Sequence, residues 1–195
     1  MTIPALQRPA EEMAAASEEG DSEEAGLIRD AVAGEGRSFD RIVQIHSPRV
    51  FRFLCQMTRH RQDAEDLTQQ TFIKAFHNLA RYDARRPIIN WLLTIARNCA
   101  LNHFRSARKW VEIPEETASD APSPSVEAEQ REEAAGVWER ARACLSQGQF
   151  EALWLRFAEG LSTCEAAELM GYTQTHVKVL VFRARQKLIK GGLPS

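Results

Sequence analysis

The sequence predicts an all-α protein made of two small helical domains with an acidic linker between them. Apolar residues recur every three or four positions through most of the chain, as on one face of a helix, and the alternation typical of strands is absent. Two segments, residues 1–24 and 112–133, are strongly acidic. The second contains three prolines and several serines, so it predicts an extended linker that separates two globular parts.

The distribution of charge predicts a polyanionic partner. The net charge of the 195 residues is only −2. Residues 1–24 contain one basic and seven acidic residues, and residues 112–133 contain one basic and eight, so the rest of the chain carries a net charge of +11. Basic modules held apart from acidic segments are typical of proteins that bind a polyanion such as nucleic acid.

The cysteines and the apolar runs indicate a cytoplasmic protein. Cys55, Cys99, Cys144 and Cys164 form no C-x-x-C pair and lie in apolar, helix-like contexts, so we interpret them as buried reduced thiols. The N-terminal segment has acids where a secretory signal would have bases. No apolar run approaches the length of a membrane span, so no membrane insertion is expected.

Residues 1–36 are expected to form an acidic, largely disordered extension. Residues 1–24 are rich in Ala, Glu, Ser and Pro and contain no aromatic residue. Such a segment buries too little apolar surface to offset the entropy lost on ordering. We expect at most a short nascent helix here.

Residues 37–111 are expected to form a compact helical bundle. Pro48 interrupts the first apolar stripe and is expected to break or start a helix, with Ser47 as the N-cap. The residues of this stripe are Phe39, Ile42, Val43, Val50, Phe51, Leu54 and Met57.

Two further helices complete the predicted bundle. Asp63 can cap the first of them, whose apolar stripe consists of Ala64, Leu67, Thr71, Ala75 and Leu79. Residues 81–90 break the pattern and predict a loop, after which Asn90 is expected to cap the last helix. The apolar stripe of the last helix consists of Trp91, Leu92, Ile95 and Cys99.

Residues 134–193 predict several shorter helices with recognisable ends. Two stretches have the spacing of a capping box, and a glycine follows each helix where C-caps are common. The boxes are Ser146–Gln149 and Ser162–Glu165, and the glycines are Gly160 and Gly171. A turn at residues 171–173 then leads to a long basic helix capped by Thr173, so this part of the chain predicts a helix-turn-helix.

The basic helix carries the candidate residues for duplex DNA. Its inward stripe is expected to consist of Val177, Val181, Ala184 and Leu188. In such motifs the start of the second helix enters the major groove, and flanking cations hold phosphates. The candidates are Thr173, Gln174, Thr175, His176, Lys178, Val179, Phe182, Arg183 and Arg185. An ordinary helical hairpin with a solvated basic face is the alternative.

A second basic surface is predicted on the first domain. The loop contributes Arg81, Tyr82, Arg85 and Arg86, and the following helix contributes Asn98, Asn102, Arg105 and Lys109 on a stripe opposite its apolar residues. Arginines beside an aromatic residue suit a single strand, whose bases stack and whose phosphates need cations. The alternative is a solvated helix end with cations that favour its C-terminal dipole.

A tight polar group stands on the helix predicted at residues 61–76. Asp66, Gln69 and Gln70 lie close together on its polar side. A solvated helix face needs no particular order of polar groups, whereas a surface that holds a partner does. This group therefore indicates a protein interface.

Three segments, in this order and with the acidic linker between them, closely resemble the extracytoplasmic-function sigma factors of bacteria. They are "DAEDLTQQTFIKAF", "WLLTIARNCALNHFR" and "STCEAAELMGYTQTHVKVLVFRARQKL". The resemblance covers most of residues 37–190. It implies that residues 37–111 are sigma region 2, that residues 134–193 are the helix-turn-helix of sigma region 4, and that residues 112–133 are the acidic linker between them.

The resemblance also implies a function and its partners. A sigma factor binds core RNA polymerase, recognises the −10 and −35 promoter elements and assists melting of the DNA. Asp66, Gln69, Gln70 and Phe72 would bind the clamp helices of the largest subunit, although Phe72 also suits the core, and the flap of the second-largest subunit is a further partner. The loop and the last helix of the first domain would bind the opened −10 element, and the helix-turn-helix would read the −35 element. Such factors are commonly held inactive by an anti-sigma factor.

The recognition helix departs from the family pattern at four positions. Thr175 and His176 stand where a Gly-Thr pair is usual, and Val179 and Leu180 stand where a Ser-Arg pair is common. Loss of that arginine predicts an unusual −35 sequence or more apolar contact with thymine methyl groups. In the first domain, Asn102 occupies a position where the family often has an acid.

No enzyme motif is apparent in the sequence. It contains no H-E-x-x-H or G-x-S-x-G motif and no phosphate-binding glycine loop. The acids at 63, 65 and 66 are interpreted as a solvated capping cluster, because neighbours on a helix point in different directions. We therefore expect no catalytic activity, no cofactor and no metal site.

Two rival functions remain open at this point. A helix-turn-helix transcriptional regulator would bind duplex DNA without being a polymerase subunit. An adaptor that binds anti-sigma proteins would keep the fold without binding DNA, but the cations of residues 178–190 argue against it. Under the sigma hypothesis, the linker would approach the active centre of the polymerase, and neutralising Glu115, Glu116 and Asp120 would alter initiation.

Overall fold

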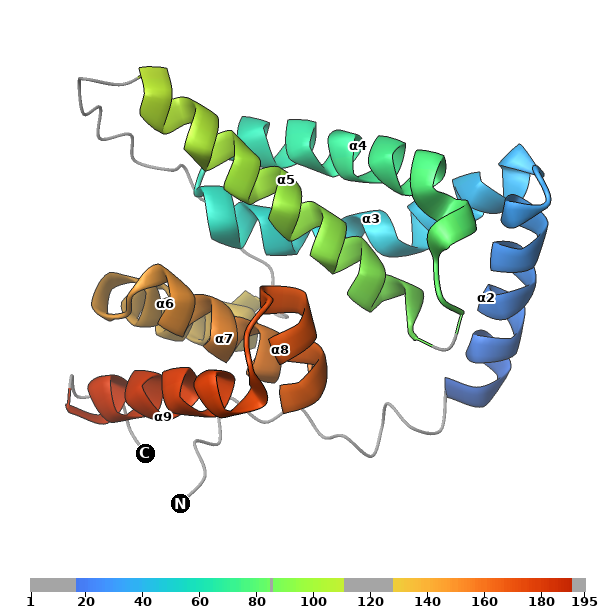
Figure 1. The fold of residues 1–195 in the computed structure, drawn as a ribbon. Helices are drawn as coiled ribbons and strands as arrows, with labels where there is room; N and C mark the ends of the chain where they lie inside the picture. Colours follow the sequence, from blue (N-terminus) through green and yellow to red (C-terminus); the bar gives the residue numbers. More distant parts are fainter. Residues whose placement is uncertain (1–16, 85, 111–127, 191–195) are drawn as a thin grey trace. The chain divides into compact units, whose positions relative to one another are not determined.

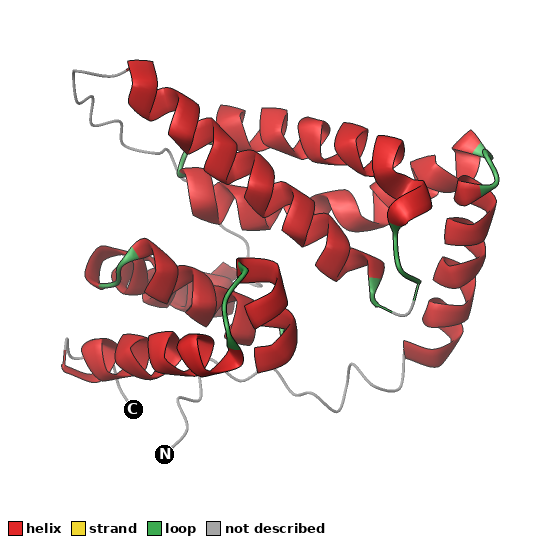
Figure 2. Ribbon diagram, in the orientation of Figure 1, coloured by secondary structure: helices red, strands yellow, loops and turns green. Residues whose placement is uncertain are grey.

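The computed structural model describes residues 17–84, 86–110 and 128–190, and every regular element in these ranges is a helix (Figure 1 and Figure 2). The helices separate into two compact units, one with α2–α5 and one with α6–α9. This confirms the predicted all-α fold. The segments 1–16 and 111–127 lie outside the described residues, and with them the first part of the predicted extension and most of the predicted linker.

Helix α2 (Ser17–Val32) is the clearest departure from the predicted extension. Ile28 and Ala31 are buried, with exposed fractions of 7% and 8%, where α2 packs against α3. Glu24 Oε1 lies 2.7 Å from Nε2 of His46 on α3. These contacts are with distant parts of the chain, so the composition of the segment alone could not predict the helix.

Helix α3 (Gly36–Thr58) runs unbroken through Pro48, so the predicted break at Pro48 with Ser47 as its cap is wrong. A proline inside a helix costs about 3 kcal/mol. Ile42 and Val50, on either side of it, are completely buried, and each such burial contributes about 1.5–3 kcal/mol. Pro48 itself is exposed, and the buried face on both sides of it keeps the helix continuous.

Helix α4 (Arg61–Asn78) has the predicted buried stripe but a different cap. All five stripe residues, from Ala64 to Leu79, are buried. The cap is His60, whose Nδ1 accepts a hydrogen bond of 3.3 Å from the backbone N–H of Asp63. Asp63 therefore lies in the first turn, where its negative charge still favours the helix dipole.

A 3₁₀ turn, η2 (Leu79–Arg81), and a loop connect α4 to α5 (Ile88–Trp110). Helix α5 begins before Asn90, so the predicted cap at Asn90 is wrong. Its most deeply buried positions include Leu92, Leu93 and Ala96. Trp91 and Ile95 are only half-buried, so the buried stripe is rotated from the predicted one.

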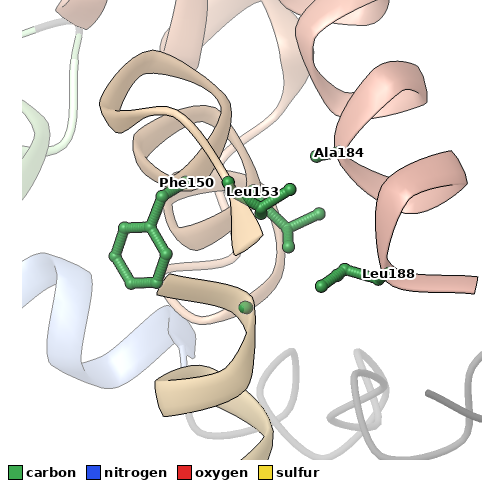
Figure 3. Packing of buried hydrophobic residues seen from close by; sticks show 6 residues of the cluster. Phe150, Leu153, Ala184 and Leu188 are labelled. Carbon is green, nitrogen blue, oxygen red and sulfur yellow. The ribbon is translucent and has the colours of Figure 1, made fainter. Parts of the chain in front are cut away.

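The second unit consists of α6 (Ala128–Cys144), α7 (Gln147–Phe157), α8 (Thr163–Met170) and α9 (Gln174–Lys190). Helix α6 begins inside the segment predicted as linker. The core of the unit contains Ala141, Leu145, Phe150, Leu153, Ala184 and Leu188, most of which are labelled in Figure 3.

The predicted N-terminal caps of the second unit and the C-cap Gly171 are confirmed, but the predicted end at Gly160 is wrong, because α7 ends at Phe157 with Ala158 as its C-cap. In α8 the backbone N–H of Ser162 donates to Glu165 Oε2 at 2.7 Å, and the N–H of Glu165 donates to Ser162 Oγ at 3.2 Å. Helix α8 ends at Gly171, which has φ 69°. Thr173 Oγ1 accepts a hydrogen bond of 3.2 Å from the N–H of His176. Gly171 and the Thr173 cap define the turn between α8 and α9.

Gly171→Ala is expected to destabilise the second unit by roughly 1–2 kcal/mol, because a side chain is unfavourable at positive φ. An added Cβ would meet no atom within 4 Å, so the cost comes from the backbone alone. Urea unfolding monitored by tryptophan fluorescence measures it. The control is Gly148→Ala inside α7, where alanine is expected to be neutral or stabilising; equal effects at both positions would contradict the explanation.

The prediction that all four cysteines are buried is correct for only some of them. Cys99 is buried and Cys55 is half-buried, where burial raises the pKa of its thiol. Cys144 and Cys164 are exposed, so the prediction that they are buried is wrong. Within the described residues, no helix has the length and apolar content needed to cross a membrane.

Candidate functional site

One face of α4 presents polar and apolar residues to solvent in a single stripe. Asp66, Gln69 and Gln70 are exposed, as predicted. The stripe continues with Ile73 and Phe76, which are 58% and 53% exposed. Residues at these spacings share one face of a helix. We call these five residues the α4 surface.

Phe72 does not belong to the α4 surface. It is 6% exposed and contributes to the core, so its prediction as an interface residue is wrong, whereas the core role considered for it is right. Sequence reasoning missed Ile73 and Phe76. The signal for them was present, because both are large apolar residues outside the buried stripe of α4.

Phe76 is held in place by the ring of Phe39. The two ring centroids are 5.1 Å apart with an edge-to-face geometry. A ring that is fixed on one side and exposed on the other loses little entropy when a partner covers it. The α4 surface therefore combines a carboxylate, two amides and two apolar side chains, a composition that suits a protein partner.

The loop between η2 and α5 carries part of the second predicted surface. Arg81 and Arg86 are exposed, and Tyr82 is half-buried. The Tyr82 ring lies 5.3 Å from the ring of Trp91, and its hydroxyl donates a hydrogen bond to the carbonyl oxygen of Arg86. Arg85 lies outside the described residues.

Helix α5 adds Asn98, Asn102 and Arg105, which are all exposed, as predicted. They stand at spacings of four and three residues, so they share one face of the helix. The side chain of Lys109 is outside the described part. The loop and this face together offer amides and guanidinium groups, which can bind bases and phosphates.

The start of α9 carries the third predicted surface. The candidates from Thr173 to Arg183 are exposed, including Phe182 at 62%. Arg185 is half-buried and lies over the ring of Phe157, 5.9 Å from its centroid, so part of its role is packing inside the unit. Tyr172 was missed. It is exposed, and its ring lies 4.6 Å from that of His176.

An open groove of about 400 Å³ lies along the second half of α9. Its lining residues are Gln149, Phe182, Arg183, Gln186, Lys187 and Lys190. The cations of this lining lie along one side of α9, next to the exposed Phe182 in the middle of the helix, and this arrangement suits a DNA backbone beside the major groove. Together, the two units form a helical protein with a helix-turn-helix and a separate basic helical bundle, which is a class of nucleic-acid-binding protein.

Comparison with known proteins defines the family. The family described as Sigma-70 region 2 matches residues 42–110, and that described as Sigma-70, region 4 matches residues 137–188. The chain is 31% identical to the ECF RNA polymerase sigma factor SigM of Bacillus subtilis, over 77% of this chain and 93% of that protein. It is 32% identical to the ECF RNA polymerase sigma factor BldN of Streptomyces coelicolor, over 84% of this chain and 64% of that protein.

Solved structures agree with these matches. The sigma factor RpoE of Bartonella quintana, determined with the anti-sigma factor NepR, is 26% identical with a TM-score of 0.64, and the match covers 79% of this chain and 96% of that chain. The protein therefore belongs to the extracytoplasmic-function RNA polymerase sigma factors.

Proposed function

We propose that the protein directs core RNA polymerase to specific promoters through three separate surfaces. The α4 surface binds the clamp helices of the largest polymerase subunit. The loop and exposed face of α5 hold the opened −10 element, and the start of α9 reads the −35 element in duplex form. The observation that carries the proposal is that these three exposed surfaces occur in one chain, on two units that each have their own core.

The chemistry of each surface supports its assignment. Asp66 and the two glutamines can form charge-assisted and amide hydrogen bonds with a coiled coil, and Ile73 and Phe76 add apolar contact at the other end of the α4 surface. The amides and arginines of the loop and α5 match unpaired bases and phosphates. The exposed cations and apolar side chains of α9 match phosphates and thymine methyl groups.

Reconstitution with core polymerase tests the proposal. Purified protein is added to core polymerase and a library of promoter sequences, and the transcripts are sequenced. Transcripts that start at fixed distances from two shared sequence elements are expected. Duplex DNA binding without polymerase, together with no specific transcripts, would support a conventional helix-turn-helix regulator instead.

An anti-sigma factor is a further proposed partner, by analogy with the NepR complex of RpoE. We also propose that the protein acts in the cytoplasm and has no catalytic activity of its own, since nucleotide addition is the chemistry of the polymerase. Co-purification of the protein from its native cells, followed by mass spectrometry, tests the proposed partners. Recovery of core polymerase subunits is expected, and their absence would contradict the proposal.

A further inference from the structure

Tyr82 occupies the start of the loop where the sequence predicts a base-stacking residue. Its ring packs against Trp91 of α5, with ring planes at 51° and centroids 5.3 Å apart. Its hydroxyl donates a hydrogen bond to the carbonyl oxygen of Arg86. Tyr82 is therefore held at both ends by its own domain, with its ring against α5 and its hydroxyl on the loop.

The hydroxyl bond links two short turns of the loop. The backbone N–H of Tyr82 donates to the carbonyl of Leu79 at 3.0 Å, and the N–H of Arg86 donates to the carbonyl of Asp83 at 3.0 Å. Each of these bonds closes one short turn. The Tyr82 hydroxyl joins the first turn to the second, so it fixes how Arg81 and Arg86 are placed relative to each other.

Helix α2 packs against η2, the turn that leads into this loop. It lies beside η2 in the same unit (Figure 1), and the 2.7 Å pair of Glu24 with His46 attaches it to α3. Burial of the ring, and then the negative charges of Glu24 and Asp83, raise the pKa of Tyr82 to about 12. The hydroxyl therefore stays protonated, and remains a donor, throughout the physiological pH range.

We propose that Tyr82 is a positioning residue, whose hydroxyl fixes the shape of the strand-binding loop, and not a platform on which bases stack. A stacked base needs an open ring face, whereas this ring is half-buried against Trp91. The contribution of Tyr82 to DNA binding then comes through the placement of Arg81 and Arg86. This inference rests on the proposed binding of single-stranded DNA to the loop and α5.

Tyr82→Phe separates the two roles, because phenylalanine keeps the ring and removes the hydroxyl. The protein is assembled with core polymerase, and its affinity is measured for a pool of single-stranded DNA randomised at six positions. Loss of the loop bond is expected to weaken binding by about three- to tenfold. Sequencing of the bound DNA is expected to show weaker base preference, since a less defined loop discriminates less well.

Two controls separate positioning from general damage to the fold. Binding of the variant to core polymerase is expected to match the wild type, because the α4 surface is untouched. Exchange of the Tyr82 and Arg86 amide hydrogens, which are bonded to Leu79 and Asp83, is expected to accelerate, and exchange in α9 is expected to remain unchanged. A variant with wild-type exchange and wild-type strand binding would overturn the inference.

Tyr82→Leu identifies the alternative role directly. If stacking is the role of Tyr82, the leucine variant loses strand binding while the phenylalanine variant binds normally, and this result would also overturn the inference. Failure of the wild-type assembly to bind any single-stranded DNA would overturn the proposed strand binding itself, and the inference with it.

Discussion

Replacing Asp66 by alanine is expected to weaken binding to core RNA polymerase by about thirtyfold, or about 2 kcal/mol. The carboxylate is exposed at one end of the α4 surface, where a partner would cover it. Removing one member of a covered charge pair leaves its partner desolvated and unpaired, which is the main cost. Titration of fluorescently labelled core polymerase with the wild type and the variant measures this effect.

Glu65→Ala is the matched control for this change. Glu65 is the neighbouring acid on the same helix, but its carboxylate is paired with Arg61 Nε at 2.9 Å and it lies outside the α4 surface. Its removal is expected to leave polymerase affinity within about twofold, because exposed pairs contribute little. Equal loss in the two variants would indicate that total negative charge is responsible, and the assignment of the α4 surface would fail.

Arg183→Ala is expected to reduce binding of the polymerase assembly to promoter DNA by roughly ten- to a hundredfold. Arg183 is exposed on α9 and lines the groove beside Phe182. It is the expected source of a specific contact, since its guanidinium group can form paired hydrogen bonds with a base or a phosphate. Electrophoretic mobility shifts with a duplex selected from the library measure the loss.

The salt dependence of binding reports which contact Arg183 makes. A phosphate contact is expected to lower the slope of log affinity against log salt by about one, with similar losses on all sequences. A base contact is expected to relax the preference at one promoter position. Arg140→Ala is the charge-matched control, because Arg140 is exposed on α6 and away from the proposed DNA-binding residues of α9. An equal loss of binding at Arg140, or no loss at Arg183, would contradict the proposal that α9 reads the −35 element.

Local hydrogen bonds and apolar spacing explain why much of the fold could be predicted from sequence. The capping box of Ser162 and Glu165 needs only residues three positions apart, and it forms as expected. The buried stripe of α4 follows directly from its three- and four-residue spacing. The exposure of Asp66 and Phe182 follows from the same spacing, since residues outside the stripe face solvent.

The features that sequence reasoning missed depend on contacts between distant residues. Helix α3 passes through Pro48 because burial on both sides outweighs the local cost. Helix α2 is ordered by its packing against α3, which its composition does not reveal. The contacts of the Tyr82 hydroxyl with Arg86 and of its ring with Trp91 could not be predicted either, because they depend on how the loop folds onto α5.

Permanganate footprinting of a promoter selected from the library tests the central claim most directly. The reagent oxidises unpaired thymines, so it reports whether the −10 element is open. The account predicts reactive thymines in the −10 element when core polymerase and wild-type protein are both present. It predicts none when either one is omitted, and none when the Asp66→Ala variant is used at a concentration that limits assembly with core polymerase. A −10 element that stays paired in the complete assembly would contradict the account.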